Sequence, residues 1–321
     1  MRSLPSISNQ INEKLILKII KEKYGELGPF FFNLVSNWFV RAYSHFKDID
    51  KFIIVIYFIN KHLIFYRRNG LKIDFDTFYK DRTIEIEKIN ISNMSKDLLI
   101  PKETVRRKIL ELEKKKIIKR IGKKIFLDRS AFSNAKPTNT LNEISVLLNE
   151  FNKILKNEKL VENVFEVNEI TKSIKENFSF CWYQFNKFWF LFTNRWRSEL
   201  KDLETCCIGY ILVISASQNK NFKPKELNLK SYAKLIMGSD DKGVNAMSIS
   251  EITGIPRPTV VRKLKYLINN NYLFINEKKL ISLNIRGFTS KKTEKLRNGN
   301  IIDLSNFIFR VFNQIKIINT N

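Results

Sequence analysis

Two segments of the chain repeat each other, and this internal repeat is the feature that most restricts the possible folds. Residues 91–112 read ISNMSKDLLIPKETVRRKILEL, and residues 249–267 read ISEITGIPRPTVVRKLKYL. The two align, with Ile-Pro, Thr-Val and Arg-Lys in common, if the first carries three extra residues at Lys96 to Leu98. A fold that contains the same unit twice is therefore expected.

The similarity extends on both sides of this segment. Downstream, FNKI at 151–154 matches FNQI at 312–315. A length of 321 residues also fits two domains. We therefore divide the chain into a first unit, residues 1–157, and a second unit, residues 158–321. Upstream, residues that precede an apolar, helix-like run recur at constant spacing: Arg41, Lys47, Asp48 and Asp50 in the first unit, and Arg195, Lys201, Asp202 and Glu204 in the second.

Charge and composition restrict the class of partner. Lys and Arg number 57 against 32 Asp and Glu, a formal net charge of +25 that favours a polyanion such as nucleic acid. The chain is rich in Lys, Ile and Asn, as expected of AT-rich coding, so the positions of the charges must count for more than their total. The hydrophobic fraction of 44% indicates a packed globular protein.

Scarce or badly spaced residues disfavour several other classes. The three cysteines, Cys181, Cys206 and Cys207, have neither a metal-ligand spacing nor an even number for disulfides, so we expect no metal, no cofactor and a reducing cytoplasm. With only two histidines, His45 and His62, and no phosphate-cradle motif, no enzyme is expected. No apolar run approaches the ~20 residues of a membrane span, and the first residues lack the apolar region of a signal peptide.

Apolar spacing predicts long helices in the second unit. Residues between Phe185 and Trp196 form the apolar stripe of an amphipathic helix, and the aromatic run at 178–196 favours helix packing over a ligand pocket. Another helix is expected from about Leu203 to Ser215, in which Cys206 and Cys207 are small buried hydrophobes rather than redox sensors.

A short helix, a turn and a further helix come next. Ser248 and Glu251 form a capping box that predicts the start of the short helix. Gly254 allows a sharp turn, and Pro258 occupies the first turn of the following helix, where a missing amide is tolerated. That helix is expected to run to about Asn270.

Alternating apolar residues then replace the helical spacing. LFINEKKLISL (273–283) and IIKRIGKKIFL (117–127) each indicate two short strands around a polar turn. The order helix, helix, turn, helix, hairpin is that of a winged helix-turn-helix. We therefore predict a mainly α fold with small β-hairpin wings: two winged helix-turn-helix units plus long packing or dimerisation helices. The first head lies at about 89–128 and the second head at about 247–284.

The last helix of each head has one face that must point to the core. Apolar residues at i, i+4 and i+7 fix this face, and Arg107 and Arg262 then fall on the opposite one. An Arg fork can bond guanine O6 and N7 together, which is worth about 1–3 kcal/mol of discrimination. The residues expected to face the core are Val105, Ile109 and Leu112, and Val260, Leu264 and Leu267.

Further basic and hydroxyl side chains of the heads are expected to bind phosphates, or a thymine methyl in the case of threonine. The chain has 16 Arg, yet four of them fall within 101–108 and 256–263, where an even distribution would place about one. The predicted DNA-binding residues are Lys102, Thr104, Arg106, Arg107, Lys119, Arg120, Lys123 and Lys124 in the first head, and Arg257, Thr259, Arg262, Lys263, Lys278 and Lys279 in the second.

With these motifs, the second unit resembles MarR-type winged-helix transcription regulators over most of its length. The resemblance lies in the long first helix, the segment SISEITGIPRPTVVRKLKYL, the hydrophobic wing, and LNIRG at 283–287. It implies regulation of transcription at a pseudo-palindromic operator in double-stranded DNA. It also implies a small-molecule effector that enters between the dimer-forming and the DNA-reading parts. The first unit departs from the pattern, with three extra residues, no Gly at the turn, Glu103 in place of Pro258, and no Gly after Leu127-Asp128.

Because one chain holds two heads, we predict a monomeric, intramolecular pseudo-dimer that reads an asymmetric site, with a homodimer as the alternative. Family members place their recognition helices about one helical turn, ~34 Å, apart. Two other functions remain open at this point. A dual winged-helix replication initiator would bind an array within an origin, and a winged-helix scaffold for other proteins would show no salt-sensitive DNA affinity.

Overall fold

The chain is mainly helical and carries two small antiparallel sheets, one of three strands and one of two. The computed structural model describes residues 10–86, 90–122, 124–129, 136–217, 227–237, 243–277, 279–284 and 288–319. Within these ranges, no helix combines the length and the apolar character needed to cross a bilayer.

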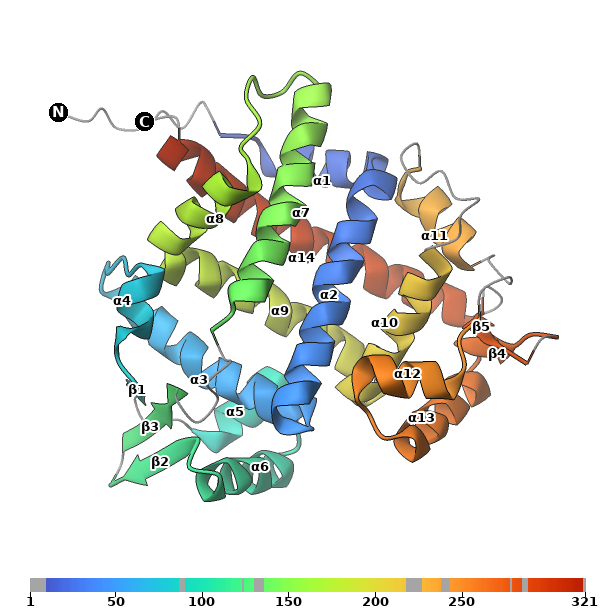
Figure 1. Cartoon of the computed structure of the whole chain (residues 1–321), viewed down its shortest axis with the longest axis horizontal. Helices are drawn as coiled ribbons and strands as arrows, with labels where there is room; N and C mark the ends of the chain where they lie inside the picture. Colours follow the sequence, from blue (N-terminus) through green and yellow to red (C-terminus); the bar gives the residue numbers. More distant parts are fainter. Residues whose placement is uncertain are drawn as a thin grey trace.

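The two halves of the chain repeat one order of elements (Figure 1). The first half contains α1 (Glu13–Glu22), α2 (Tyr24–Phe46), α3 (Ile49–Arg68), α4 (Phe75–Lys80), β1 (Thr83–Ile86), α5 (Ile91–Leu98), α6 (Lys102–Lys114), β2 (Ile118–Ile121), β3 (Lys124–Asp128) and α7 (Thr138–Asn157). The second half contains α8 (Val167–Glu176), α9 (Phe178–Leu200), α10 (Leu203–Ser217), α11 (Leu229–Met237), α12 (Ala246–Thr253), α13 (Arg257–Asn269), β4 (Leu273–Ile275), β5 (Ile281–Leu283) and α14 (Phe288–Asn319). In place of β1, the second half has a single bridge between Val244 and Ile281.

The halves pack against each other through reciprocal contacts. Helix α2 packs on α10, while α9, the counterpart of α2, packs on α3, the counterpart of α10. In the same way α1 packs on α14, and α8 packs on α7. The matching rings of Phe151 and Phe312 meet edge to face, with centroids 5.7 Å apart. Reciprocity of this kind characterises an isologous dimer interface, here formed within one chain.

A buried asparagine explains why FNKI and FNQI recur. The amide of Asn313 on α14 accepts from Ile11 N at 2.9 Å and donates to Ile11 O at 3.1 Å. Its counterpart, Asn152 on α7, accepts from Phe165 N at 2.8 Å and donates to Asn163 O at 3.1 Å. The last helix of each half therefore holds the segment that enters the first helix of the other half.

A second contact made by both halves explains the arginine that recurs towards the end of the second helix of each half. Arg41 on α2 pairs with Glu143 and donates to Thr140 Oγ1 at 3.0 Å, both on α7. Arg195 on α9 pairs with Asp303 and donates to Asn300 Oδ1 on α14 at 2.7 Å. Each arginine thus ties the long second helix of its half to the last helix.

The long helices and their buried faces were predicted correctly. The side chains of Phe185, Trp189 and Phe192 on α9 are at most 1% exposed. Trp189 packs against Trp38 of α2, with ring centroids 4.2 Å apart, so the aromatic run forms the core between the halves. Cys206 and Cys207 are buried in α10, as expected.

The expected three-residue insertion in the first head was wrong. Helices α5 and α12 both have eight residues, and each begins after an asparagine N-cap, Asn90 or Asn245. The hydroxyls of Ser95 and Ser250 donate to the carbonyls of Ile100 and Ile255 at 2.6 and 2.7 Å, which fixes an ungapped register. The sequence alignment matched the letters Ile-Ser, whereas helix starts are set by the residue that caps the first amides.

The expected capping box at Ser248 and Glu251 was also wrong. Ser248 lies inside α12, and its amide donates to the Asn245 side chain at 2.9 Å. The turn residue Gly254 behaves as expected, with a φ of 69° at the C-cap. Its counterpart, Leu99, adopts the same left-handed conformation with a φ of 52°, so the first half makes this turn without glycine.

We predict that Asn313→Ala lowers the free energy of unfolding by about 1–3 kcal/mol, because it leaves the buried amide and carbonyl of Ile11 without partners. Chemical denaturation measures this change. Gln314→Ala, at the neighbouring half-buried position, is the matched control and should change the free energy by less than about 0.5 kcal/mol. Equal effects of the two substitutions would contradict the role of Asn313.

Candidate nucleic-acid interface

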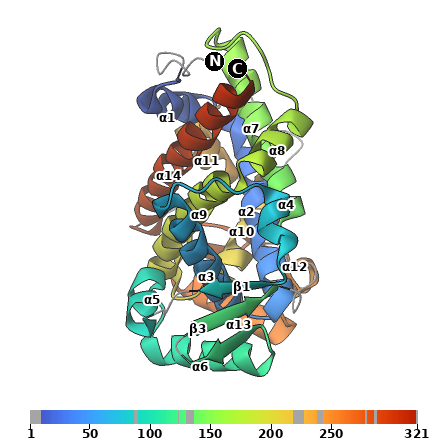
Figure 2. The same cartoon turned by 90° about the vertical axis from the view of Figure 1, so that its left-hand side faces the viewer.

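The two heads lie at one edge of the molecule. Figure 1 shows α6 and α13 along the lower edge, with the β2–β3 and β4–β5 hairpins on opposite outer sides. Figure 2, turned by 90°, again has both helices at that edge, with α1 and α7 at the far end. Reciprocal packing of the long helices therefore presents equivalent elements of the two halves on the same side.

The core-facing residues of α6 and α13 are those predicted. Val105, Ile109 and Leu112 are at most 2% exposed, and their counterparts on α13 are at most 3% exposed. Both hairpins also form where alternation predicted them, with Ile118 opposite Leu127 and Leu273 opposite Leu283. Because these residues are buried, the opposite faces of α6 and α13 point to solvent.

The lysine shared by the two heads points inward. Lys108 and Lys263 donate to Asp48 and Asp202 at 2.7 Å, and these carboxylates also accept amides in the first turns of α3 and α10. The Lys263 side chain is only 12% exposed, so its expected contact with DNA is corrected. Asp202, just before α10, supplies a carboxylate that binds Lys263 to the protein.

The arginines that precede these lysines point outward. Arg107 has 70% of its side chain exposed, and Arg262 is exposed as well. Lys102 and Arg257, at the first positions of α6 and α13, are exposed, whereas Thr104 and Thr259 are half-buried beside them. Neither helix has a side-chain cap on its first amides, so the start of α6 can bind an anion. In α13, Pro258 has no amide hydrogen and Thr259 N donates to Pro256 O at 2.9 Å, which leaves the amide of Arg257 for an anion.

Four of the basic residues predicted to contact DNA in the first head lie beside carboxylates. Arg106 Nη1 donates to both oxygens of Glu103 at 2.9 and 3.0 Å. Lys119 is exposed, with no ion pair among the described residues, and Lys123 lies outside them. The other pairs are Arg107 with Glu111 at 3.9 Å, Arg120 with Glu113 at 2.5 Å, and Lys124 with Glu85 at 2.7 Å.

The second head differs in this respect. Arg257, Arg262 and Lys279 are exposed, and none of them forms an ion pair with another described residue. Lys279 stands in the turn of the β4–β5 hairpin with a φ of 58°. The predicted contact Lys278 lies outside the described residues.

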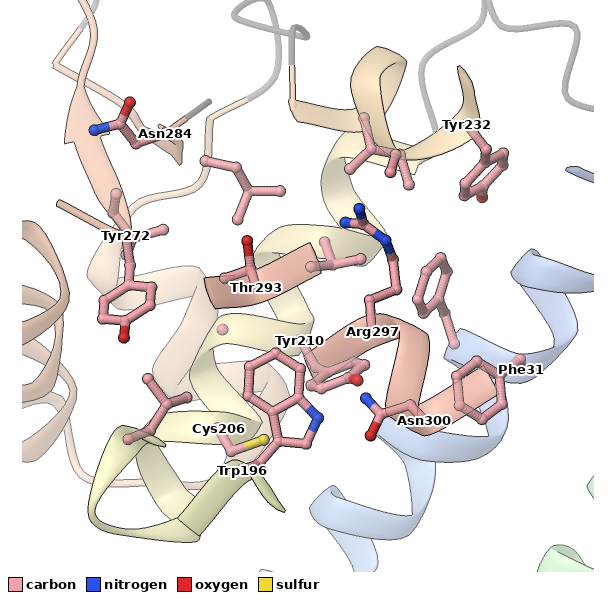
Figure 3. Close-up of a pocket in the computed structure, with 18 of the residues that line it drawn as sticks. Phe31, Trp196, Cys206, Tyr210, Tyr232, Tyr272, Asn284, Thr293, Arg297 and Asn300 are labelled. Carbon is pink, nitrogen blue, oxygen red and sulfur yellow. The ribbon is translucent and has the colours of Figure 1, made fainter. Parts of the chain in front are cut away.

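A cavity of about 150 Å³ lies between the second head and the helices of the core. Tyr272, Leu273 and Leu283 of the head line it together with Tyr210 of α10. Figure 3 shows Tyr272 and Tyr210 among the lining side chains. Arg297 reaches in from α14, and its buried Nε has no hydrogen-bond partner. Burial lowers the pKa of this guanidinium below its ordinary value. The result is an apolar site with one cationic group.

The corresponding place in the first half is smaller, about 90 Å³. Phe52, Val55 and Tyr79 line it, and they occupy the positions that Cys206, Gly209 and Ala233 occupy in the second half. Sequence reasoning missed the cavity, although comparison of the two halves at these positions carried the signal.

The remaining titratable groups singled out from the sequence are packing residues. His45 stacks on Phe52, and His62 Nε2 lies 2.6 Å from Tyr66 Oη; burial lowers the pKa of both imidazoles. Burial raises the pKa of the Cys181 thiol to about 12, which makes it unreactive. Within the described ranges, no cluster of His, Cys, Asp or Glu is arranged to hold a metal ion.

The chain was compared with protein-family models, with curated proteins and with solved structures. None of the three comparisons found a match. The resemblance to MarR-type regulators therefore rests on the sequence motifs described above.

We predict that Lys263 reacts with an acetylating reagent roughly two- to fivefold more slowly than Lys265, because Lys263 must first leave Asp202. Lys265 is exposed two residues further along the same helix and serves as the internal control. Mass spectrometry of briefly acetylated, folded protein measures both rates. Faster acetylation of Lys263 would show that its ion pair does not persist in solution.

Proposed function

We propose that this protein is a sequence-specific, double-stranded DNA-binding transcription regulator, in which two winged helix-turn-helix units form an intramolecular pseudo-dimer. The observation that carries the proposal is the exposure of Arg107 and Arg262 at equivalent positions of α6 and α13, on one edge of the molecule. Net charge alone would not carry it, because the adjacent lysines are used for internal ion pairs.

The chemistry of each head suits a major groove. The exposed arginine offers two parallel donors to a guanine edge, while the uncapped helix start and Lys102 or Arg257 beside it suit a backbone phosphate. Lys119 and Lys279 on the hairpins would add phosphate contacts that carry no sequence information.

The rigid connection between the halves determines how the two heads would act together. Helices α2, α3, α9 and α10 pack reciprocally, so α6 and α13 keep a fixed relative position. We expect them to bind successive major grooves, with half-site centres about 34 Å apart on one face of the duplex. A binding site upstream of a gene supports the regulator, whereas an array within an origin would identify an initiator.

We predict that binding is strongly salt-dependent and that two substitutions separate base reading from phosphate binding. With ~6–10 phosphate contacts, affinity should fall about 10³- to 10⁵-fold between 50 and 200 mM salt. Arg262→Ala should relax preference at one or two base pairs by about 1–3 kcal/mol each, and Lys279→Ala should weaken all sequences alike. Fluorescence anisotropy on duplexes selected from a random pool measures both effects.

Lys172→Ala removes a positive charge from α8, away from the heads, and is the control for net charge. It should leave affinity nearly unchanged. Salt-independent binding, or no duplex binding, would reject the proposed function and favour a scaffold. Equal losses from Lys172→Ala and Arg262→Ala would reject direct reading by Arg262.

The cavity beside the second head supports control by a small-molecule effector. A volume near 150 Å³ suits one aromatic ring, since an engineered cavity of that size binds benzene. The buried Arg297 favours an acidic group on the ring. A ligand that fills this space would press on Tyr272, Leu273 and Leu283 and so alter how the head sits on the core.

We predict that benzoate raises the melting temperature of the wild-type protein, whereas benzylamine, which is repelled by Arg297, does not. Gly209→Val should abolish the shift, because the first half fills the same position with Val55 and a Cβ at Gly209 meets no atom within 4 Å. The variant should still bind DNA. A benzoate shift that persists in Gly209→Val would place the ligand elsewhere.

A further inference from the structure

We propose that the two heads are unequal: the second head supplies most of the base selectivity, and carboxylates restrain the arginines of the first. The chain would then bind its DNA site in a single orientation, with a strong half-site under α13 and a weak one under α6. This inference rests on the proposed function and adds a division of roles within it.

The first observation concerns the two outward arginines. Arg107 lies 3.9 Å from a carboxylate oxygen of Glu111, one turn further along α6. The residue one turn after Arg262 is Tyr266, which brings no charge. One oxygen of the Glu111 carboxylate pairs with Lys51, and the other is the one near Arg107. A guanine edge presented to Arg107 must compete with this second oxygen, whereas Arg262 has no such competitor among the described residues.

The second observation concerns the start of each helix. Glu103, 75% exposed, occupies the first turn of α6 and holds Arg106 in a bidentate pair, while Pro258 and Val261 stand at the equivalent positions of α13. A carboxylate at a helix start is attracted to the amides that would otherwise bind a phosphate. Glu103 therefore repels the DNA backbone from the start of α6, whereas Pro258 brings no charge to the start of α13 and leaves Arg257 there to attract a phosphate.

The third observation concerns the hairpins. Arg120 pairs with Glu113, and Lys124 pairs with Glu85 on β1, the third strand of the first sheet. The second half has only the Val244 bridge in place of that strand, and Lys279 is exposed in its hairpin turn. The additional strand thus brings Glu85 beside Lys124, whereas Glu277 in the turn of the second hairpin forms no ion pair with Lys279.

The ion pairs of the first head are weak. Exposed pairs such as these contribute only about 0–1 kcal/mol each to stability, so they do not lock the side chains. Lys102 and Lys119 of the first head, and Arg257 and Lys279 of the second, are exposed with no ion pair among the described residues, so the two heads offer similar numbers of phosphate contacts. The heads should therefore differ in how they read bases more than in their salt dependence.

A matched pair of substitutions tests the inequality. On a duplex selected by the wild-type protein, Arg262→Ala should weaken binding roughly 5- to 150-fold, and Arg107→Ala less than about threefold. Glu103→Gln should strengthen binding and make the salt slope steeper by up to about 0.9, because it frees Arg106 and removes a repulsive charge. Equal losses from the two arginine variants, or no gain from Glu103→Gln, would overturn the inference.

Orientation provides a readout that does not depend on affinity. The three native thiols are buried, so Lys114→Cys or Asn269→Cys, at equivalent exposed ends of α6 and α13, would carry a DNA-cleaving iron chelate specifically. Each label should cleave at a separate position on the selected duplex. Cleavage at both positions by either label would mean that the chain binds in both orientations, and would contradict the proposal.

Failure of this inference can be told apart from failure of the proposed function. A wild-type protein that binds no duplex in a salt-dependent way rejects the function itself. A wild-type protein that binds, but in which the heads respond equally, rejects only the division of roles.

Discussion

The exchange of contacts between the halves is the constraint on which the rest of the structure depends. Each half contributes a last helix whose buried asparagine, Asn152 or Asn313, holds the entering segment of the other half. The rings of Phe151 and Phe312, the residues just before these asparagines, meet each other in the core. Because buried amides must be paired, neither half can rotate away without leaving backbone groups unsatisfied. The common edge that carries α6 and α13 follows from this arrangement.

Residues that are the same in both halves make the contacts that hold each half together. Residues that differ between the halves give the two heads different surfaces. The shared Lys108 and Lys263 bind each head to the start of α3 or α10 through Asp48 and Asp202. By contrast, Glu103 and Pro258 occupy equivalent positions, so that the start of α6 carries a carboxylate and the start of α13 does not. The same comparison accounts for the cavity, where Gly209 leaves a space that Val55 fills in the other half. The two halves therefore share their packing and differ at their surfaces.

Local sequence patterns predicted most of the helices and strands. Side-chain contacts between elements far apart in the sequence could not be predicted in this way. The buried face of α13 and both hairpins could be predicted from the spacing of apolar residues alone. Apolar residues recur every three to four positions in the helix and at every second position in the strands. The inward turn of Lys263 could not be predicted, because its partner Asp202 lies on another helix. The pair of Lys124 with Glu85 depends on the third strand, which the sequence pattern did not indicate. The pair of Arg106 with Glu103 was readable from its spacing of three residues on one helix.

The covalent link between the halves also changes how the protein responds to dilution. If the halves were separate chains, they would have to associate before both heads could contact one duplex. The fraction of protein assembled into dimers would then fall steeply at low protein concentration. In the proposed intramolecular pseudo-dimer, the effective concentration of the second head is the same at any protein concentration. Occupancy of a DNA site by the proposed regulator should therefore rise in direct proportion to the number of protein molecules when these are scarce, without the threshold that dimer assembly imposes.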